Sequence, residues 1–446
     1  RADAAKPGVK HIILKPDYDV DEIDDIDASY NSIYGKIVSN WRKNTGKLYW
    51  HIEIPANTTA TVYLPYGETK EIGSGVYDFE ADWLLSKISR NFENSNTQNP
   101  KIIANEFLYK SASFPECHSA TMCELPNGDL VATYFGGTKA RNPDCCIWVS
   151  RKPKGATNWS APILAAHGKM PFEEMNLTKE EIMKEGKNGE ITLRDSRKAA
   201  WNPVIYYNKT NKKLEIYFKL GINPRDWDGW IVRSSDGGKS WSKREQLPKG
   251  ILGPVKNKIF EEGTRLIAPT SLEEGGWRIY FELSDDGGKT WRKTADVDAP
   301  LTEAPAAEAG KKVNAIQPAI LKLDSGRLAA VARTRSERVG ISFSDDKGET
   351  WSKLQLLSVP NNNSGLDAVT LQNPIDGGYK HIMICNDYPV PPGIKSGKGL
   401  RTPLSLLRSK DGINWEHWLT LEDSPISQYS YPSIIQTKDG HIHCIY

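Results

Sequence analysis

The sequence predicts an all-β protein in which a six-bladed β-propeller follows a small N-terminal β-sandwich. Two observations predict the propeller: a turn motif that recurs along the chain, and a strand–turn–strand repeat that precedes its copies. A third observation, the short alternation of apolar and polar residues over positions 10–80, predicts the sandwich. At 446 residues the chain is too long for one ordinary core, so two or three domains are expected.

The turn motif has the pattern S-x-D-x-G-x-T/S-W. Intact copies begin at Ser234, Ser284 and Ser344, a shortened copy begins at Ser409, and a degenerate one begins at Ser150. Its Asp accepts backbone N–H bonds and its Gly supplies a positive φ, so each copy predicts a tight hairpin. The closing Trp is expected to be buried under the hairpin. Three intact copies are far beyond chance.

The second repeat is a strand, a turn with Gly and another strand. Its clear copies are residues 125–130, 324–328 and 438–442, and weaker ones at 212–214, 262–266 and 376–378 fill the places between them. Counting these turns gives six units, the last of which stops after two strands. The predicted domains are a sandwich at 1–85, a connector at 86–111 and a six-bladed propeller at 112–446.

Composition excludes several classes of partner. The 58 basic and 56 acidic residues give a net charge of +2, which removes the electrostatic argument for nucleic acid or an anionic membrane surface. No run of 18 or more apolar residues exists, so no membrane-spanning segment is expected. The six Cys form no CxxC pair and no zinc spacing, and they are interpreted as buried free thiols. We expect no metal and no cofactor.

A charged, helix-prone insertion occupies residues 173–187, in the wider gap between the first two turn motifs. Because insertions project from a propeller face, it could form a wall of a sugar site. It could equally be a solvated surface helix, since charge runs usually lie on solvated faces.

The front segment resembles a known domain. Residues 30–41, 51–65 and 73–77 closely resemble the C-terminal β-sandwich of bacterial α-L-rhamnosidases, and the resemblance covers about the first 85 residues. It includes none of that family's catalytic barrel. The resemblance implies a longer parent protein that fuses rhamnosidase and propeller segments.

The propeller segment resembles the sialidase superfamily, in which the turn motif is called the Asp-box. Besides the boxes, the resemblance rests on residues 113–118, 201–203, 253–257, 316–318 and 429–432, which are closest to bacterial predicted sialidases. It implies a sialidase-type propeller that hydrolyses terminal sialic acid. In that family three arginines grip the sugar carboxylate, a Tyr paired with Glu is the nucleophile, and an Asp is the acid/base. It also implies a secreted, periplasmic or cell-surface bacterial protein.

The resemblance assigns roles residue by residue. Arg333 matches the second family arginine and Arg401 the third. Tyr431 matches the nucleophile, and Tyr429 competes with it because residues two apart in a strand point to the same face. Asp144 is the best match to the acid/base. A neutral phenol suits a nucleophile beside a carboxylate, because it avoids charge repulsion until a base deprotonates it.

Two positions depart from the family pattern. His118 stands where the first family arginine is expected, and the Glu that assists the Tyr is replaced near 315–317. A His there could protonate, deprotonate or bind a hydroxyl, so it joins the catalytic candidates. The remaining substrate-binding candidates are Gln317, Arg141 and Trp201.

Three functions follow, all with an acidic sugar or glycan as partner. The leading one is a retaining exo-glycosidase of the sialidase class. The second is a lyase or glycosidase acting on rhamnose- and uronate-containing polysaccharide; in a lyase, His118 or Tyr431 would remove a proton and the arginines would neutralise the enolate-like charge. The third is a non-catalytic carbohydrate-binding propeller. The sequence leaves the oligomeric state open.

Overall fold

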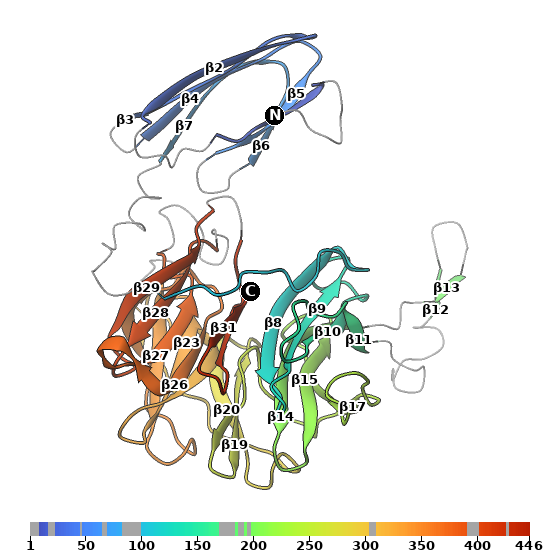
Figure 1. Ribbon diagram of the computed structural model, residues 1–446, viewed down its shortest axis with the longest axis vertical. Coiled ribbons are helices and arrows are strands. Elements are labelled where there is room, and N and C mark those ends of the chain that lie inside the picture. Colours follow the sequence, from blue (N-terminus) through green and yellow to red (C-terminus); the bar gives the residue numbers. More distant parts are fainter. Residues whose placement is uncertain are drawn as a thin grey trace. The chain divides into compact units, whose positions relative to one another are not determined.

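The computed structural model describes residues 9–16, 23–44, 47–64, 69–82, 100–168, 183–185, 191–193, 198–302, 309–389, 401–424 and 428–446. The regular structure of this part is strand, apart from one short 3-10 turn, which confirms the all-β prediction (Figure 1). No helix in the described ranges is long and apolar enough to cross a bilayer. The chain divides into two compact units. The first comprises residues 1–98, 391–403 and 421–428, and the second comprises 99–390, 404–420 and 429–446.

The first unit contains two sheets. One has the order β1 (His11–Leu14), β5 (Thr59–Tyr63), β6 (Thr69–Ile72), and the other β2 (Asp25–Ser32), β3 (Gly35–Asn44), β4 (Lys47–Ile54), β7 (Gly75–Asp82). The period-two alternation of β4 buries Leu48, Trp50 and Ile52 in the core of this unit. Strand β1 pairs with β5 in parallel, whereas the other described strand pairs of this unit are antiparallel. Three strands of the other sheet separate β1 from β5 in sequence, which gives the long connection that a parallel pair requires.

Besides the hairpin of the insertion described below, the described residues of the second unit form five four-stranded antiparallel sheets and a two-stranded one, each built from consecutive strands. The first two sheets are β8 (Glu116–Glu124), β9 (Leu130–Gly137), β10 (Cys146–Lys152), β11 (Ile163–Ala166), and β14 (Ala199–Asn208), β15 (Lys213–Gly221), β16 (Asp228–Ser234), β17 (Glu245–Gln246). The third and fourth are β18 (Phe260–Glu262), β19 (Arg265–Leu272), β20 (Arg278–Ser284), β21 (Arg292–Lys293), and β22 (Ala315–Lys322), β23 (Leu328–Thr334), β24 (Arg338–Ser344), β25 (Gln355–Pro360). The fifth is β26 (Asp367–Ile375), β27 (Tyr379–Cys385), β28 (Leu404–Ser409), β29 (Trp415–Glu422), with the short 3-10 turn η3 (Asp376–Gly378) between its first two strands; the last is β30 (Ser433–Gln436), β31 (Ile442–Ile445).

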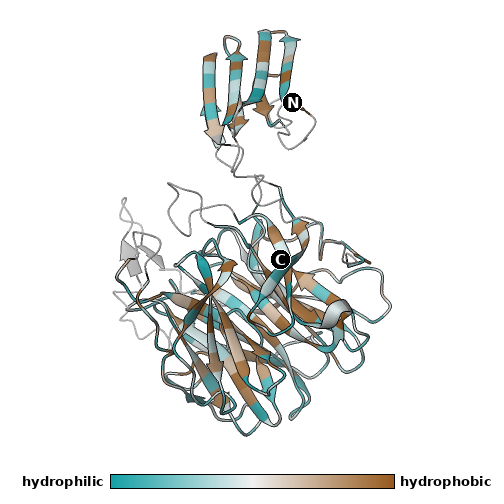
Figure 2. Cartoon of the chain, turned by 90° about the vertical axis from the view of Figure 1, so that its left-hand side faces the viewer, coloured by the Kyte–Doolittle hydropathy of each residue, from teal (hydrophilic) through white to brown (hydrophobic). Residues whose placement is uncertain are grey.

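Neighbouring sheets of the second unit meet through apolar faces. Strand β8 contacts β14, β19 contacts β22, β22 contacts β26, β26 contacts β30, and β30 contacts β8. One apolar cluster lies between the first two sheets and includes Val131, Ile147 and Phe218; another lies between the fourth and fifth and includes Val331 and Met383. Figure 2 shows the apolar stretches of these strands in brown. Because both faces of most strands are covered, the strands carry continuous apolar runs instead of strict alternation.

The Asp-boxes form the hairpins that the sequence predicts. In the first intact copy, Asp236 Oδ1 accepts the Lys239 and Ser240 amides at 3.0 Å, and its Oδ2 accepts the Ser240 hydroxyl at 2.6 Å. The hydrogen bond from Ser240 is the main cause that holds the pKa of Asp236 well below its usual range. The Trp residues of the boxes are half-buried, so the expectation that they are buried is wrong. Each indole packs one side on an apolar cluster while the hairpin stays at the surface.

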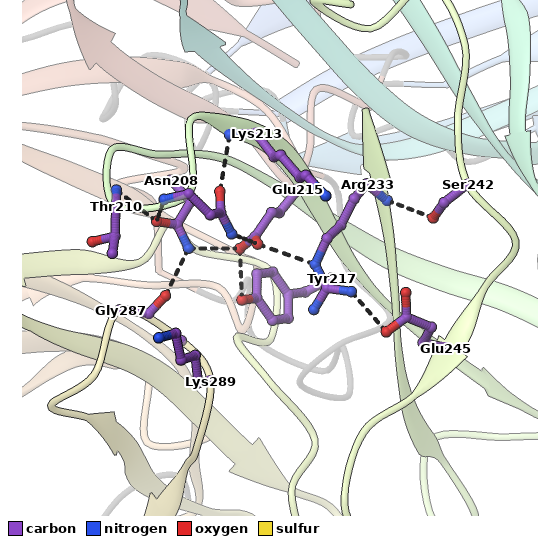
Figure 3. A network of polar contacts seen from close by, with 12 residues as sticks. Asn208, Thr210, Lys213, Glu215, Tyr217, Arg233, Ser242, Glu245, Gly287 and Lys289 are labelled. Atoms are coloured by element: carbon purple, nitrogen blue, oxygen red, sulfur yellow. Dashed lines mark hydrogen bonds and ion pairs between the residues drawn. The ribbon is translucent and has the colours of Figure 1, made fainter. Parts of the chain in front are cut away.

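A buried polar cluster around Glu215 links the second sheet to the third (Figure 3). Glu215 is 2% exposed and accepts hydrogen bonds from Tyr217, Arg233, Asn211 and Asn208. The amide of Asn208 also donates to the Gly287 carbonyl of the next Asp-box at 2.8 Å. The buried carboxylate therefore has a cation and several neutral donors around it.

The insertion does not contain the predicted helix where it is described. Met183–Glu185 (β12) pairs antiparallel with Ile191–Leu193 (β13). The sequence between them contains Asn188-Gly189, a dipeptide that favours hairpin turns, and Ile191 and Thr192 are β-branched. The rest of residues 173–187 lies outside the described residues.

The six cysteines are all free thiols, as predicted. Cys145 and Cys385 are buried, and Cys123, Cys146 and Cys444 are half-buried. Cys117 is exposed, which corrects the expectation that all six are buried; it lies at the start of β8, before that strand enters the apolar core.

Candidate active site

Each of the six sheets of the second unit contributes one non-glycine residue with a positive φ on or just before its first strand. These residues are Ser119 (56°), Asn202 (40°), Lys256 (73°), Gln317 (58°), Asn363 (64°) and Tyr431 (56°). In β8, β14 and β22 the strand pairing is interrupted at the same place. A positive φ is uncommon outside glycine and costs of order 1–3 kcal/mol, and such residues concentrate at functional sites. Their repetition in sheet after sheet identifies a candidate site.

Tyr431, Arg333 and Gln317 are brought together at this place, as the sequence predicts for one site. Arg333 Nη1 donates to the Tyr431 hydroxyl at 3.0 Å, and Gln317 Nε2 donates to the same oxygen at 3.3 Å. Arg333 Nη1 also lies 3.5 Å from Gln317 Oε1. Two donors on one phenolic oxygen stabilise a negative charge there. Gln317 thus contacts the phenolic oxygen directly; that it replaces the assisting Glu of the family pattern stays a prediction.

Arg333 is a buried cation with neutral partners. It lies near the end of β23 and is 5% exposed, and its Nε donates to Asn363 Oδ1 at 2.8 Å. Its guanidinium carbon lies 5.0 Å from the ring centre of Trp277. No carboxylate of the described residues forms an ion pair with it. A buried arginine without a counter-charge is costly in a folded protein, and a bound anion would remove this cost.

Two lysines add positive charge beneath the tyrosine. Lys256 is fully buried, and its Nζ donates to Leu366 O and Pro432 O at 2.5 Å and to Asn257 Oδ1 at 2.9 Å. The pKa of Lys256 is lowered to about 7, chiefly by burial; the Asp367 carboxylate opposes this shift, and the nearby cations Lys258 and Arg333 add to it.

The positive charge of Lys258, unlike that of Arg333, is balanced by a carboxylate of the chain. Its Nζ lies 2.7 and 2.8 Å from the two oxygens of Asp367, a carboxylate that is fully buried. Asp367 also accepts the Ile434 amide at 2.9 Å. Asp367 balances the charge of Lys258, whereas Arg333 has no ion-pair partner among the described residues, so the base of the site keeps a net positive charge that suits an acidic ligand.

His118 lies beside the tyrosine. The two ring centres are 4.3 Å apart, with an angle of 50° between the planes. On its other side His118 meets Phe135 edge-on at 5.7 Å, and Phe135 packs against Trp201 at 5.9 Å. Trp201 is 7% exposed and donates its indole N–H to the Gly221 carbonyl, so it supports the wall behind His118. Its contact with a substrate stays a prediction.

Tyr429 and Tyr431 do not share a face, and that expectation is wrong. Both precede β30, and the positive φ of Tyr431 interrupts the strand-like alternation. The Tyr429 ring packs against Tyr446, and its carbonyl accepts the Asn386 amide at 3.0 Å. Tyr431 alone of the two bonds to Arg333.

The other predicted residues lie on loops. Asp144 is half-buried between β9 and β10, where its Oδ2 accepts the amide and hydroxyl of Thr138 at 3.0 and 2.5 Å. Arg141, in the same loop, is exposed and has a φ of 83°. Arg401 is half-buried and lies in the 391–403 stretch that groups with the first unit. The roles of these three residues stay predictions.

Sequence reasoning missed several residues at the site. Lys256 lies inside the 253–257 segment that carried part of the resemblance, but a lysine there has no single meaning. Asn363 and Trp277 carry no local pattern at all. Arg335 stands two positions after Arg333 and its guanidinium carbon lies 4.1 Å from the ring centre of the same Trp277. The spacing of the two arginines was the available signal.

Comparisons with known proteins agree with this geometry. A sequence model described as the BNR repeat-like domain matches residues 128–444, and one described as the bacterial alpha-L-rhamnosidase C-terminal domain matches residues 3–77. An anhydrosialidase from Macrobdella decora is 29% identical over 232 residues, which are 48% of this chain and 28% of that protein. The match thus spans less than a third of that relative's length. Both resemblances seen in the sequence are confirmed.

Solved structures show a similar fold. The NanB sialidase from Streptococcus pneumoniae has a TM-score of 0.55 at 14% identity, over 92% of this chain and 80% of that chain. The intramolecular trans-sialidase from Ruminococcus gnavus has a TM-score of 0.54 at 14% identity, over 73% of this chain and 89% of that chain. In sequence and in fold, the second unit is sialidase-like.

Proposed function

The chain belongs to the family of the BNR repeat-like domain, and on that premise we propose that it is a glycoside hydrolase of the sialidase class. Its proposed substrate is a glycan that ends in sialic acid or a related acidic sugar. The relatives named sialidase, anhydrosialidase and intramolecular trans-sialidase support this class. On this proposal the protein acts at the cell surface, in the periplasm or after secretion, where such glycans are met.

One observation carries the proposal: a buried arginine, which pairs with no carboxylate of the described residues, donates to the hydroxyl of a tyrosine held at a positive φ. Arginine pairs with a carboxylate through two parallel hydrogen bonds, and the electropositive base of the site favours the same ligand. A ligand carboxylate at Arg333 would place the adjoining sugar carbon near Tyr431.

The proposed reaction proceeds through a covalent intermediate. The Tyr431 oxygen attacks the anomeric carbon, the bond to the leaving oxygen breaks, and Asp144 gives that oxygen a proton. The phenolic proton passes to His118, the titratable ring beside Tyr431. Arg333 and Gln317 stabilise the negative charge on the phenolic oxygen as it forms. A water oxygen then attacks the anomeric carbon and gives its proton to Asp144, while the bond to the Tyr431 oxygen breaks and that oxygen takes its proton back from His118.

The decisive test is Tyr431→Phe. This variant should bind an acidic sugar almost as well as the wild type and should lose hydrolysis, because only the bond-forming oxygen is removed. A fluorinated sialosyl substrate should label the wild type covalently at Tyr431 and leave Tyr431→Phe unlabelled. The matched control is Tyr429→Phe, whose ring packs away from Arg333. Full hydrolysis by Tyr431→Phe would overturn the assignment.

A lyase is the second candidate, and Gln317 is the observation that favours it. The amide cannot take a proton from Tyr431, whereas the arrangement of Arg333, Tyr431 and His118 fits proton removal next to a carboxylate held by arginine. A uronate oligosaccharide would then give an unsaturated product that absorbs ultraviolet light. His118→Ala should abolish that absorbance in a lyase and should mainly weaken binding in a hydrolase.

We also infer that the six sheets form a closed six-bladed propeller. The contacts between strands of neighbouring sheets, which return from β30 to β8, support it. So does the apolar cluster that joins Met122 and Ala132 of the first sheet to Ile435 and Ile445 of the last. A crystal structure would test it: closure requires that β30 and β31 lie beside β8 and complete the circle.

A further inference from the structure

Arg335 is a second arginine beside the candidate site. It follows the end of β23, two residues beyond Arg333, and the indole of Trp277 contacts both guanidinium groups. The Trp277 amide donates to Asn314 Oδ1 at 2.9 Å, and its indole N–H donates to Glu273 Oε2 at 3.2 Å. Because the ring is held at both ends, it fixes the two arginines in a row.

The Arg335 guanidinium has no hydrogen-bond or ion-pair partner among the described residues. Its Nε is buried and without an acceptor, and only its backbone amide is bonded, to Asn314 O at 3.0 Å. Two other arginines that lie over aromatic rings have a carboxylate partner. Arg327 lies over Phe343 and pairs with Asp345. Arg408 lies over Tyr379 and pairs with Glu416.

The lack of an acceptor for the Arg335 guanidinium among the described residues has an energetic cost. A buried donor without an acceptor costs free energy, and the cost is larger for a charged group. Glu273 is close to Trp277, yet its carboxylate bonds to the indole. Arg335 is therefore a half-buried cation that forms no ion pair with a carboxylate of the described residues. It lies next to a site that already suits an acidic sugar.

We propose that Arg335 and Trp277 form a second anion subsite, which binds the carboxylate of the sugar unit next to the terminal acidic sugar. This inference rests on the proposed function, because Arg333 must bind the terminal carboxylate. Arg333 is held over Tyr431 by Asn363 and Gln317, so the two arginines serve two separate carboxylates. The preferred substrate is then a chain of at least two acidic sugars.

Two probes that share a terminal sugar test the subsite. Disialic acid carries a carboxylate on its second unit, whereas sialyllactose has a neutral second unit. Their affinities are measured by titration calorimetry on Tyr431→Phe, which prevents turnover. We expect disialic acid to bind about tenfold more tightly, the size of one hydrogen-bonded charge pair. Adding Arg335→Gln should abolish the preference and leave sialyllactose within about twofold.

Matched variants guard against indirect effects. Arg327→Gln removes an arginine over an aromatic ring at the opposite end of β23 and should leave the preference unchanged. Arg335→Lys keeps the charge without the planar fork and should keep part of the preference. Melting temperatures of all variants establish that they fold.

The outcomes separate the two proposals. If both probes bind Tyr431→Phe with equal affinity, the subsite is wrong while the proposed function stands. If Arg335→Gln weakens both probes equally, Arg335 belongs to the terminal-sugar site and the subsite is again wrong. If neither probe binds at all, the proposed substrate class fails, and the subsite fails with it.

Discussion

Two buried polar clusters of the second unit are built in opposite ways. Around Glu215, a buried carboxylate faces Arg233, which also pairs with Glu245 at 2.7 Å, and neutral donors fill the remaining positions (Figure 3). Around Arg333, a buried cation faces only amides and a hydroxyl, with Lys256 nearby. The first cluster contains its own counter-charge. The second lacks one, and a ligand can supply it.

The difference indicates what each cluster does. A balanced cluster stabilises the fold, because every buried charge has its partner in the chain. An unbalanced one is retained at a cost to stability, and such costs concentrate at functional sites. The two clusters should therefore respond differently to substitution.

The largest effect should be a loss of stability in Glu215→Ala. Its removal leaves the buried Tyr217 hydroxyl without its acceptor and takes one acceptor each from Arg233 and the Asn208 amide, which should lower the free energy of unfolding by about 3–5 kcal/mol. Urea unfolding measures this loss. The affinity of the folded fraction for an acidic sugar should not change, and a change there would break the comparison.

Arg333→Ala should show the opposite response. Affinity for an acidic ligand should fall by about 2–5 kcal/mol, because a partly desolvated charge pair is lost. Urea unfolding should show a much smaller loss than in Glu215→Ala, since an uncompensated charge leaves the interior. Calorimetry with sialyllactose measures the first quantity. Wild-type affinity in this variant would exclude Arg333 as the carboxylate-binding group.

Gln317→Glu should make the second cluster resemble the first. The new carboxylate would lie beside Arg333 and would compete with the ligand for it. We expect weaker binding, by about 1–3 kcal/mol, and a more stable fold. Gln317→Met, which has a similar volume and no charge, is the control. Binding that strengthens in Gln317→Glu would contradict the charge argument.

The smallest effect concerns pH. The pKa of Lys256 is lowered to about 7 by burial, so this side chain loses its positive charge as the pH rises through about 7. An acidic ligand should then bind a few-fold more tightly at pH 6 than at pH 8. Lys256→Met should flatten the profile. A pH response that survives in Lys256→Met belongs to another group, with His118 as the first candidate.

The sequence was informative where a structural feature depends on residues that are close together in the chain. The Asp-box hairpins are specified by five positions within eight consecutive residues, so their hydrogen bonds appear as expected. Tyr431 and Arg333 were found through their positions in a family pattern. Arg335 and Lys256 were missed because their importance comes from partners that lie far away in the chain, or that are absent.

Two predictions from the sequence were wrong for reasons that lie in the local backbone. The strand alternation that placed Tyr429 and Tyr431 on one face assumes extended backbone, and the φ of 56° at Tyr431 breaks that assumption. The helix expected in the insertion rested on charge and propensity, yet Met183–Glu185 pairs as a strand. Propensity is a weak guide where a neighbouring segment offers pairing.

The hydrogen bonds of Lys256 have a consequence for the order of folding. Its Nζ bonds to carbonyl groups that are 110 and 176 residues further along the chain. Such distant partners meet late, because a long loop must close before either contact forms. Until then the ammonium group stays hydrated, and the backbone beside Tyr431 lacks the hydrogen bond from Lys256 to Pro432. A refolding experiment that follows ligand binding alongside strand formation should therefore find that binding competence appears in the last kinetic phase.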